Sequence, residues 1–293
     1  MDPPSRKGNL PQAPWPRRNW RCFLAPVQTP IPSRMNPILR AILFAGVLFV
    51  GMLVVLELGR RLGHRRQARE GDAGHAGFGA VEGAVFALMG LLIAFTFSGA
   101  AERFEQRRQQ ILDEANALGT VWQQLDLLPA SAQPELRDLL RRYVDARLAL
   151  YDRLPDLAGA KAEVARANEL QSAIWTRAAA AAQAPGAATP LTAMVLTSLG
   201  QAFDLAAARV AALQIHPPRI LFIMLGVFTL MSALLAGVSM GGARSRSWVH
   251  MFGFALIMAV TVYIILDLEF PRVGFIRLND ADQFIRDVRQ SMQ

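Results

Sequence analysis

The hydrophobic residues of this chain are concentrated in four long blocks. The blocks cover residues 38–58, 83–101, 220–243 and 247–266, and charged residues stand only near or beyond their ends. A helix needs about 20 mostly apolar residues to cross ~30 Å of hydrocarbon at ~1.5 Å per residue. One such block can also be a buried core helix, but four in a chain of this size favour a membrane protein. Since only helices satisfy their backbone groups across lipid at these lengths, we expect four transmembrane helices.

The composition agrees with that assignment. The chain has 293 residues, of which 53% are hydrophobic and 18% charged, and its mean hydropathy is +0.25. Soluble domains average about 45–50% apolar and about 25% charged residues. The lipid bilayer is therefore the expected surroundings of much of the chain. A single cysteine excludes a disulfide framework and any multi-cysteine metal or iron–sulfur site.

Residues 1–36 differ in composition from everything that follows. They contain eight of the 17 prolines and six basic residues. A Pro-rich basic stretch cannot bury a core, so we expect a disordered tail that is suited to binding anionic lipid head groups. An alternative interpretation is that Met35, just before the first apolar block, is the true start of the protein.

Residues 101–218, between the second and third blocks, are predicted to form a helical domain outside the membrane. Apolar residues recur there at heptad spacing, which is typical of helices packed lengthwise on one another. No proline or turn cluster separates this stripe from the second block, so we expect one continuous helix over residues 81–128. The stripe consists of Phe104, Ile111, Ala115, Leu118, Trp122 and Leu125.

Three more helices are expected in this domain, separated by proline-containing turns. The first begins near Ser131 and Glu135, and the others cover residues 161–184 and 191–213. The heptad positions of the first are Leu136, Leu139, Tyr143, Arg147, Leu150 and Leu154.

No strand-like alternation is long enough to build a sheet, so the predicted fold is all-α. The expected organisation is a tail (1–36), transmembrane helices 1 and 2 (37–100), the helical domain (101–218), transmembrane helices 3 and 4 (219–270), and a C-terminal segment with a short helix (271–293).

Catalytic chemistry is not indicated. The four histidines are scattered, and no nucleophile elbow or phosphate-binding loop is present. We therefore expect no enzyme, no cofactor, no bound metal and no nucleic-acid partner. Two small-residue pairs, Gly79/Gly83 and Gly237/Gly241, have the spacing that lets spanning helices approach closely. Acids at the span ends, such as Glu82 and Asp267, are either ion ligands or simply interfacial.

Two sequence blocks carry a family resemblance. Residues 90–119 read GLLIAFTFSGAAERFEQRRQQILDEANALG, followed by LDLLP at 125–129, and residues 267–277 read DLEFPRVGFIR. These blocks resemble those of the bacterial bestrophin-like family of four-span membrane proteins. The resemblance covers nearly everything after residue 37 and implies a bestrophin-like fold.

A more distant resemblance connects the chain to the bestrophin ion channels. The shared features are Gly-Leu-x-x-x-Phe in the second span, an Arg-aromatic pair at Arg103–Phe104, and an acidic residue, a proline and an Asn-Asp pair after the last span. Those last residues are Glu269, Pro271, Asn279 and Asp280. The Trp that follows the Arg in bestrophins is Phe104 here, and the spacing after Pro271 differs.

Bestrophins are pentamers with one axial pore, and an apolar neck of that pore is lined by the second span. Counted from Arg103, the resemblance places the neck at Ala87, Leu91 and Phe95, on one face of a helix. Ala87 is smaller than the bulky residue expected at its position. The alternative interpretation is that Leu91 and Phe95 pack against another span. The charged residues near the span ends, Glu82, Arg103, Asp267 and Glu269, are candidates for an ion vestibule.

An even number of spans places both termini and the helical domain on one side of the membrane. Arginines of the first short loop, residues 60–69, are balanced by those after the last span, so the positive-inside rule does not decide the side. The resemblance implies that the protein lies in the inner membrane of a bacterium and that its termini are on the cytosolic side.

Two functions remain open at this point. In the first, the protein is a homo-oligomeric ion channel, a pentamer by the resemblance, that passes inorganic ions through rings of Leu91 and Phe95. In the second, it is a membrane-anchored helical scaffold or sensor that binds a protein partner and conducts nothing.

Overall fold

The computed structural model describes residues 37–70, 78–154, 156–185, 187–213, 217–242, 248–272 and 274–293. All of them belong to one compact unit, Met35–Gln293. The tail predicted at 1–36 and the alternative start at Met35 lie outside the described residues. Over the described ranges every regular element is a helix, which confirms the all-α prediction.

The elements follow one another as eight α-helices and two short 3-10 turns within these ranges. They are α1 (Pro37–Glu70), α2 (Phe78–Gln124), η3 (Leu125–Leu127), α3 (Gln133–Asp152), α4 (Leu157–Ala182), α5 (Thr189–Ala212), α6 (Arg219–Ser239), η4 (Met240–Gly242), α7 (Trp248–Glu269) and α8 (Asp282–Ser291).

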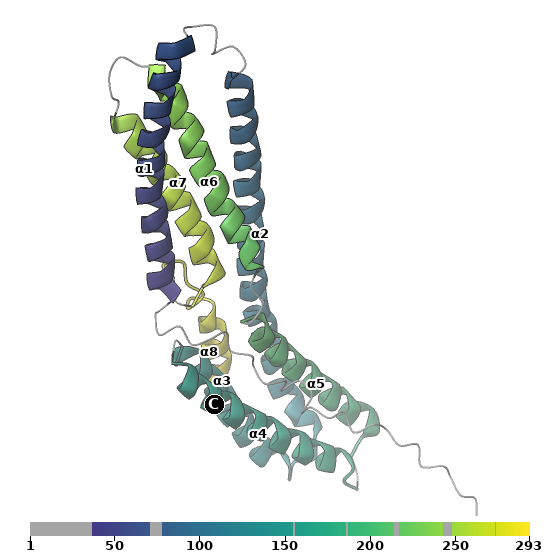
Figure 1. Cartoon of the computed structure of the whole chain (residues 1–293). Coiled ribbons are helices and arrows are strands. Elements are labelled where there is room, and N and C mark those ends of the chain that lie inside the picture. Colours follow the sequence, from purple (N-terminus) through teal and green to yellow (C-terminus); the bar gives the residue numbers. More distant parts are fainter. Residues whose placement is uncertain are drawn as a thin grey trace, which may run out of the picture. The chain divides into compact units, whose positions relative to one another are not determined.

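The four apolar blocks form a bundle of helices that lie side by side. Helix α1 packs on α6 and α7, and the first half of α2 packs on the same two helices (Figure 1). The interior of this bundle contains large side chains with almost no exposure, among them Met52, Leu56 and Leu225. Five helices of the described chain are long and apolar enough to cross a membrane, the fifth being α5.

Helix α2 is a single helix of 47 residues that leaves the bundle and continues into the helical domain. This confirms the continuous helix predicted from the lack of any breaker, with bounds that differ by a few residues. The boundary expected at residue 100 between membrane and helical domain therefore falls inside α2, without a break in the helix.

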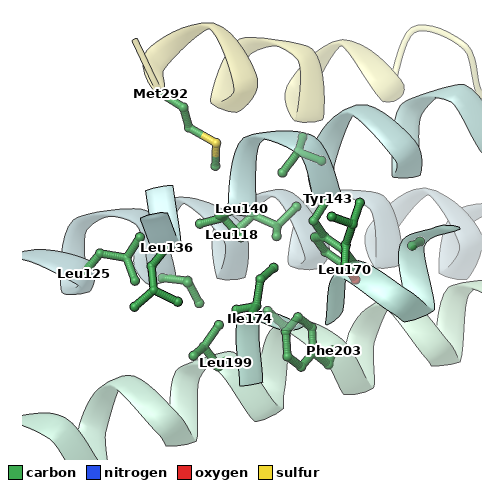
Figure 2. Packing of buried hydrophobic residues seen from close by; sticks show 14 of the residues in the cluster. Leu118, Leu125, Leu136, Leu140, Tyr143, Leu170, Ile174, Leu199, Phe203 and Met292 are labelled. Atoms are coloured by element: carbon green, nitrogen blue, oxygen red, sulfur yellow. The ribbon is translucent and has the colours of Figure 1, made fainter. Parts of the chain in front are cut away.

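The second half of α2 packs against α5 and α8, while α3 packs on α4. Their shared core takes side chains from α2, α3, α4 and α5 and from Met292 after α8 (Figure 2). The predicted heptad positions Ile111, Ala115, Leu118 and Leu125 are all buried there. Helix α5, although apolar enough to span, contributes Val195, Leu199 and Phe203 to this core.

Local chemistry explains where these helices begin and end. Proline occupies the first turn of α3 and of α5, where the missing N–H costs nothing. The Asp156 carboxylate accepts a hydrogen bond from the Ala158 N–H and caps α4. Ser131 is not the cap of α3, because Ala132 occupies the cap position, with no side-chain hydrogen bond to the helix.

The arginine-rich residues 60–69, expected as a short loop, instead continue helix α1. Arg60 and Arg61 both pair with Glu57, three and four residues earlier, at 3.2 and 2.9 Å. Pairs at this spacing support a helix beyond the apolar block. The length of an apolar block therefore predicts the part that crosses lipid, and not the end of the helix.

Glycines allow α1 and α6 to cross in backbone contact. A Cβ atom at Gly59, Gly63 or Gly237 would overlap a backbone carbonyl oxygen of the facing helix. Of the two predicted small-residue pairs, Gly237/Gly241 lies at this crossing, whereas the space around Gly79/Gly83 is open. Close approach without side chains gives extensive backbone contact between spanning helices.

Candidate functional site

One face of the spanning half of α2 is left uncovered by the rest of the chain. Leu91 and Phe95, four residues apart, are 52% and 68% exposed, and Ala87 is exposed on the same face. The opposite face is packed, with Met89 buried and Ile93 partly buried against the bundle. Only 11% of the most apolar part of α2 is buried, against 28–39% for the other candidate spans. This face must therefore contact either lipid or another protein molecule.

The point at which α2 leaves the bundle is fixed by an ion pair to α7. Arg103 Nε donates to Glu269 Oε1 at 2.8 Å, and Arg103 Nη2 donates to the same oxygen. One turn further along α2, Arg107 Nη1 donates to the Glu269 carbonyl oxygen at 3.3 Å. The side chain of Glu269 is only 1% exposed, so its charge is offset by Arg103 and not by water.

Asp267 holds the segment that follows α7. Its carboxylate accepts hydrogen bonds from the backbone N–H groups of Phe275 and Ile276 at 3.0 and 2.9 Å. It also accepts one from the Tyr263 hydroxyl at 3.2 Å. Gly274 is required there, because a Cβ atom would overlap the Asp267 carboxylate. Asp267 and Glu269 are both buried, so their roles in this structure are to shape the turn and to anchor α2.

Glu82 lies apart from the other charged candidates. It is near the start of α2, where it accepts a hydrogen bond from the Ser239 hydroxyl of α6. Along α2 at ~1.5 Å per residue, Glu82 and Arg103 are about 30 Å from each other. Of the four residues expected around one vestibule, the structure pairs Arg103 with Glu269, two residues after Asp267, whereas Glu82 lies elsewhere on α2.

A buried charge network lies in the helical domain. Glu114 of α2 accepts hydrogen bonds from Arg147 of α3 and Arg209 of α5, each at 2.7 Å. Arg209 also donates to Asp282 of α8 at 2.6 Å, and Arg272 pairs with the same carboxylate. All five side chains are almost fully buried. The network thus ties four helices together through α2.

The aromatic ring of Tyr151 completes this network. The guanidinium carbon of Arg209 lies 3.7 Å from the ring centroid, and that of Arg272 lies 4.7 Å from it. Cations over a tyrosine ring are attracted to its negative face, more strongly when water is excluded.

Burial and pairing shift the pKa values of these groups. Burial alone would raise the pKa of Glu114, but Arg147 and Arg209 outweigh it and hold the pKa below its ordinary value of 4.5. Burial would lower the pKa of Arg147, but the Glu114 carboxylate raises it above its ordinary value. Burial raises the pKa of Tyr151. The Glu114 carboxylate and the Arg147 guanidinium are therefore charged at neutral pH, while the Tyr151 phenol stays neutral.

Comparison with known proteins identifies the family. The model of the bestrophin-like domain matches residues 40–282. This chain belongs to the bestrophin-like family. The resemblance noted in the sequence is thereby confirmed. No curated protein matches the chain.

Solved structures of bestrophin homologs share this fold. A bacterial bestrophin homolog from Klebsiella pneumoniae matches with a TM-score of 0.60 at 15% identity, over 83% of this chain and 97% of that one. A point variant of that homolog matches with a TM-score of 0.63 at 15% identity, over 82% and 97% of the two chains. At such low identity the similarity concerns the fold, namely an all-helical bestrophin-like membrane protein.

Sequence reasoning missed the charge network of this bestrophin-like chain. One signal was present, because Arg147 occupies a core position of the heptad stripe predicted for α3. An arginine at such a position is buried only when it is paired. Its partners could not be identified by spacing, since Glu114 and Arg209 lie on other helices, far away in the sequence.

Proposed function

We propose that this bestrophin-like protein is an oligomeric ion channel whose apolar neck is formed by the second span. In the assembly, copies of α2 surround a central axis with Ala87, Leu91 and Phe95 facing it. The observation that carries this proposal is the uncovered face of α2, which contains these three residues. The resemblance to bestrophin channels supports a pentamer.

An apolar neck has a physical rationale as a gate. Stacked rings of apolar side chains exclude water at small diameters, so ions cross only when the rings widen. Phe95 is the largest residue of the three and is more exposed than Leu91, and it is expected to form the narrowest ring. Ala87 leaves its ring wider.

We further propose that α1, the first half of α2, α6 and α7 are the four spans. Helix α5 is apolar enough to cross lipid, but its Arg209 belongs to the buried network with α2, α3 and α8. A span carrying this arginine out of the helical domain would leave Glu114 and Asp282 without it. We propose that the helical domain and both termini lie on the cytosolic side of a bacterial inner membrane, which the resemblance to bestrophins supports.

The first test is the mass of the purified protein by light scattering, corrected for detergent. A pentamer supports a shared axis, whereas a monomer or dimer has too few copies of α2 to enclose one and rules the proposal out.

The second test is conductance in planar bilayers. Phe95→Ala is expected to raise the open probability or conductance, because it removes the largest apolar ring. Phe97→Ala is the matched control, since Phe97 is also exposed on α2 but points to a different side of the helix. Equal currents for wild type and both variants would show that Phe95 does not line the pore.

The scaffold or sensor function remains the second candidate. It is favoured by the purely apolar character of α2 from Gly83 to Phe95, which offers no polar group to an ion within the membrane. A stable oligomer that carries no current under any voltage, with wild-type or Phe95→Ala protein, would favour this candidate over the channel.

A further inference from the structure

The face of α2 that carries the neck continues without interruption into the helical domain. Because α2 is one helix, the positions within about 40° of Leu91 can be followed at ~100° per residue along its full length. Beyond Phe95 every one of these positions is polar. All of them are exposed except Asp113, which is half-buried, and they are Ser98, Glu102, Glu105, Gln109, Asp113, Asn116, Thr120 and Gln123.

This polar face contains acids, amides and hydroxyls but no basic residue. The arginines of the same stretch point elsewhere. Arg103 and Arg107 are directed to Glu269 at the end of α7, on the packed side of α2. Arg108 lies at the flank, where it pairs with Glu105 at 3.3 Å. Arg103 and Arg107 are thus on another side of the helix from Glu102, and only Arg108 reaches the edge of the polar face.

Local hydrogen bonds leave two carboxylates with their full charge. Glu102 accepts from the Gln106 amide at 3.3 Å, and Asp113 accepts from the Gln109 amide at 2.9 Å. A neutral amide orients a carboxylate without cancelling its charge, whereas Arg108 offsets the charge of Glu105. Glu102 lies two turns beyond Phe95 and is therefore the first acid that an ion meets on that side of the neck.

We infer that the pore selects inorganic cations over anions and that Glu102 is its main selectivity-determining residue. This inference rests on the proposed channel function. In a symmetric assembly each Glu102 becomes one member of a ring of carboxylates around the axis. Rings of acidic side chains concentrate cations and repel anions at the mouth of a narrow pore. Asp113, about 16 Å further along at ~1.5 Å per residue, forms a second, weaker ring.

The test is the reversal potential of the full-length protein in planar bilayers with a tenfold KCl gradient. The reversal potential of wild type is expected to shift from zero towards the potassium equilibrium potential. Glu102→Gln is expected to lower the potassium to chloride permeability ratio by roughly threefold or more. Asp113→Asn is expected to lower it less. Glu169→Gln, which removes an exposed carboxylate on α4, is the matched control and leaves the ratio unchanged.

The outcomes separate this inference from the proposed function. A wild-type reversal potential near the chloride equilibrium potential would overturn cation selection, and a permeability ratio that Glu102→Gln does not change would overturn the role of Glu102. Either result leaves the channel proposal standing. The absence of current from wild type and from Phe95→Ala would overturn the channel and this inference with it. Light scattering of each variant verifies that the assembly is intact, and an exposed residue such as Glu102 is not needed for folding.

Discussion

Arg147 and Glu114 form a 2.7 Å ion pair in the interior of the helical domain, with almost no exposed surface on either side chain. The pair joins α3 to the same helix that carries the proposed neck. Glu114 also binds Arg209, so a single carboxylate on α2 holds one guanidinium from each of two other helices. Its removal would leave the buried Arg147 guanidinium without a carboxylate and Arg209 with only Asp282.

Glu114→Gln is expected to destabilise the protein by about 3–5 kcal/mol, because breaking a buried pair leaves uncompensated charge. The measurement is thermal unfolding in detergent. Asp138→Asn is the control, since Asp138 pairs with Arg142 at the surface and is expected to cost about 1 kcal/mol or less. Equal melting temperatures for Glu114→Gln and wild type would show that the network does not hold the helices together.

The same carboxylate makes stability depend on pH. The pKa of Glu114 is lowered in the folded chain, so its contribution is complete above the ordinary value of 4.5 and is lost as pH falls through the lower folded value. Below about pH 4.5 the melting temperature of wild type is therefore expected to fall more steeply than that of Glu114→Gln. Parallel curves for the two proteins would contradict this assignment of the titrating group.

The glycine crossing of α1 and α6 predicts a position-specific effect of one methyl group. Gly237→Ala places a Cβ atom against the Leu56 carbonyl oxygen, and is expected to cost about 1–3 kcal/mol by forcing the helices apart. Gly83→Ala meets open space and is expected to be neutral or slightly stabilising. Melting temperatures of the two variants in one detergent decide the matter, and a Gly237→Ala variant as stable as wild type would count against the crossing.

The contribution of the ion pair between Arg103 of α2 and Glu269 of α7 to stability is also measurable. Arg103→Gln leaves the buried Glu269 carboxylate without its guanidinium and is expected to cost about 2–3 kcal/mol, less than a fully buried pair because Arg103 is partly exposed. Arg108→Gln, on the same helix, removes an exposed pair with Glu105 and is expected to cost below about 1 kcal/mol. The idea fails if the two variants unfold at the same temperature.

Much of the fold could be predicted because its signals are local in the sequence. The length of the apolar blocks, the lack of a breaker before Pro129 and the heptad positions of Ile111 and Leu118 each follow from the order of residues alone. The end of α1 was less predictable, because the same arginines fit an interfacial loop or a helix supported by pairs with Glu57.

The candidate site was harder to predict, because it depends on which distant residues meet. Nothing in the spacing of Glu269 points to Arg103, and nothing near Glu114 points to Arg209 or Asp282. Glu82 and Arg103, which the sequence grouped as vestibule candidates, lie about 30 Å apart along α2. Two residues that far apart on one continuous helix cannot meet within a single chain.

The unbroken course of α2 has a mechanical consequence. A helix without proline or a break behaves as a stiff rod over this length, so a rotation imposed at one end appears at the other. In the proposed channel, turning the end of α2 that lies in the helical domain would move Phe95 and Glu102 through the same angle. Opening the neck at Phe95 would then necessarily reorient the ring of Glu102 carboxylates, and any change in conductance would be accompanied by a change in ion preference.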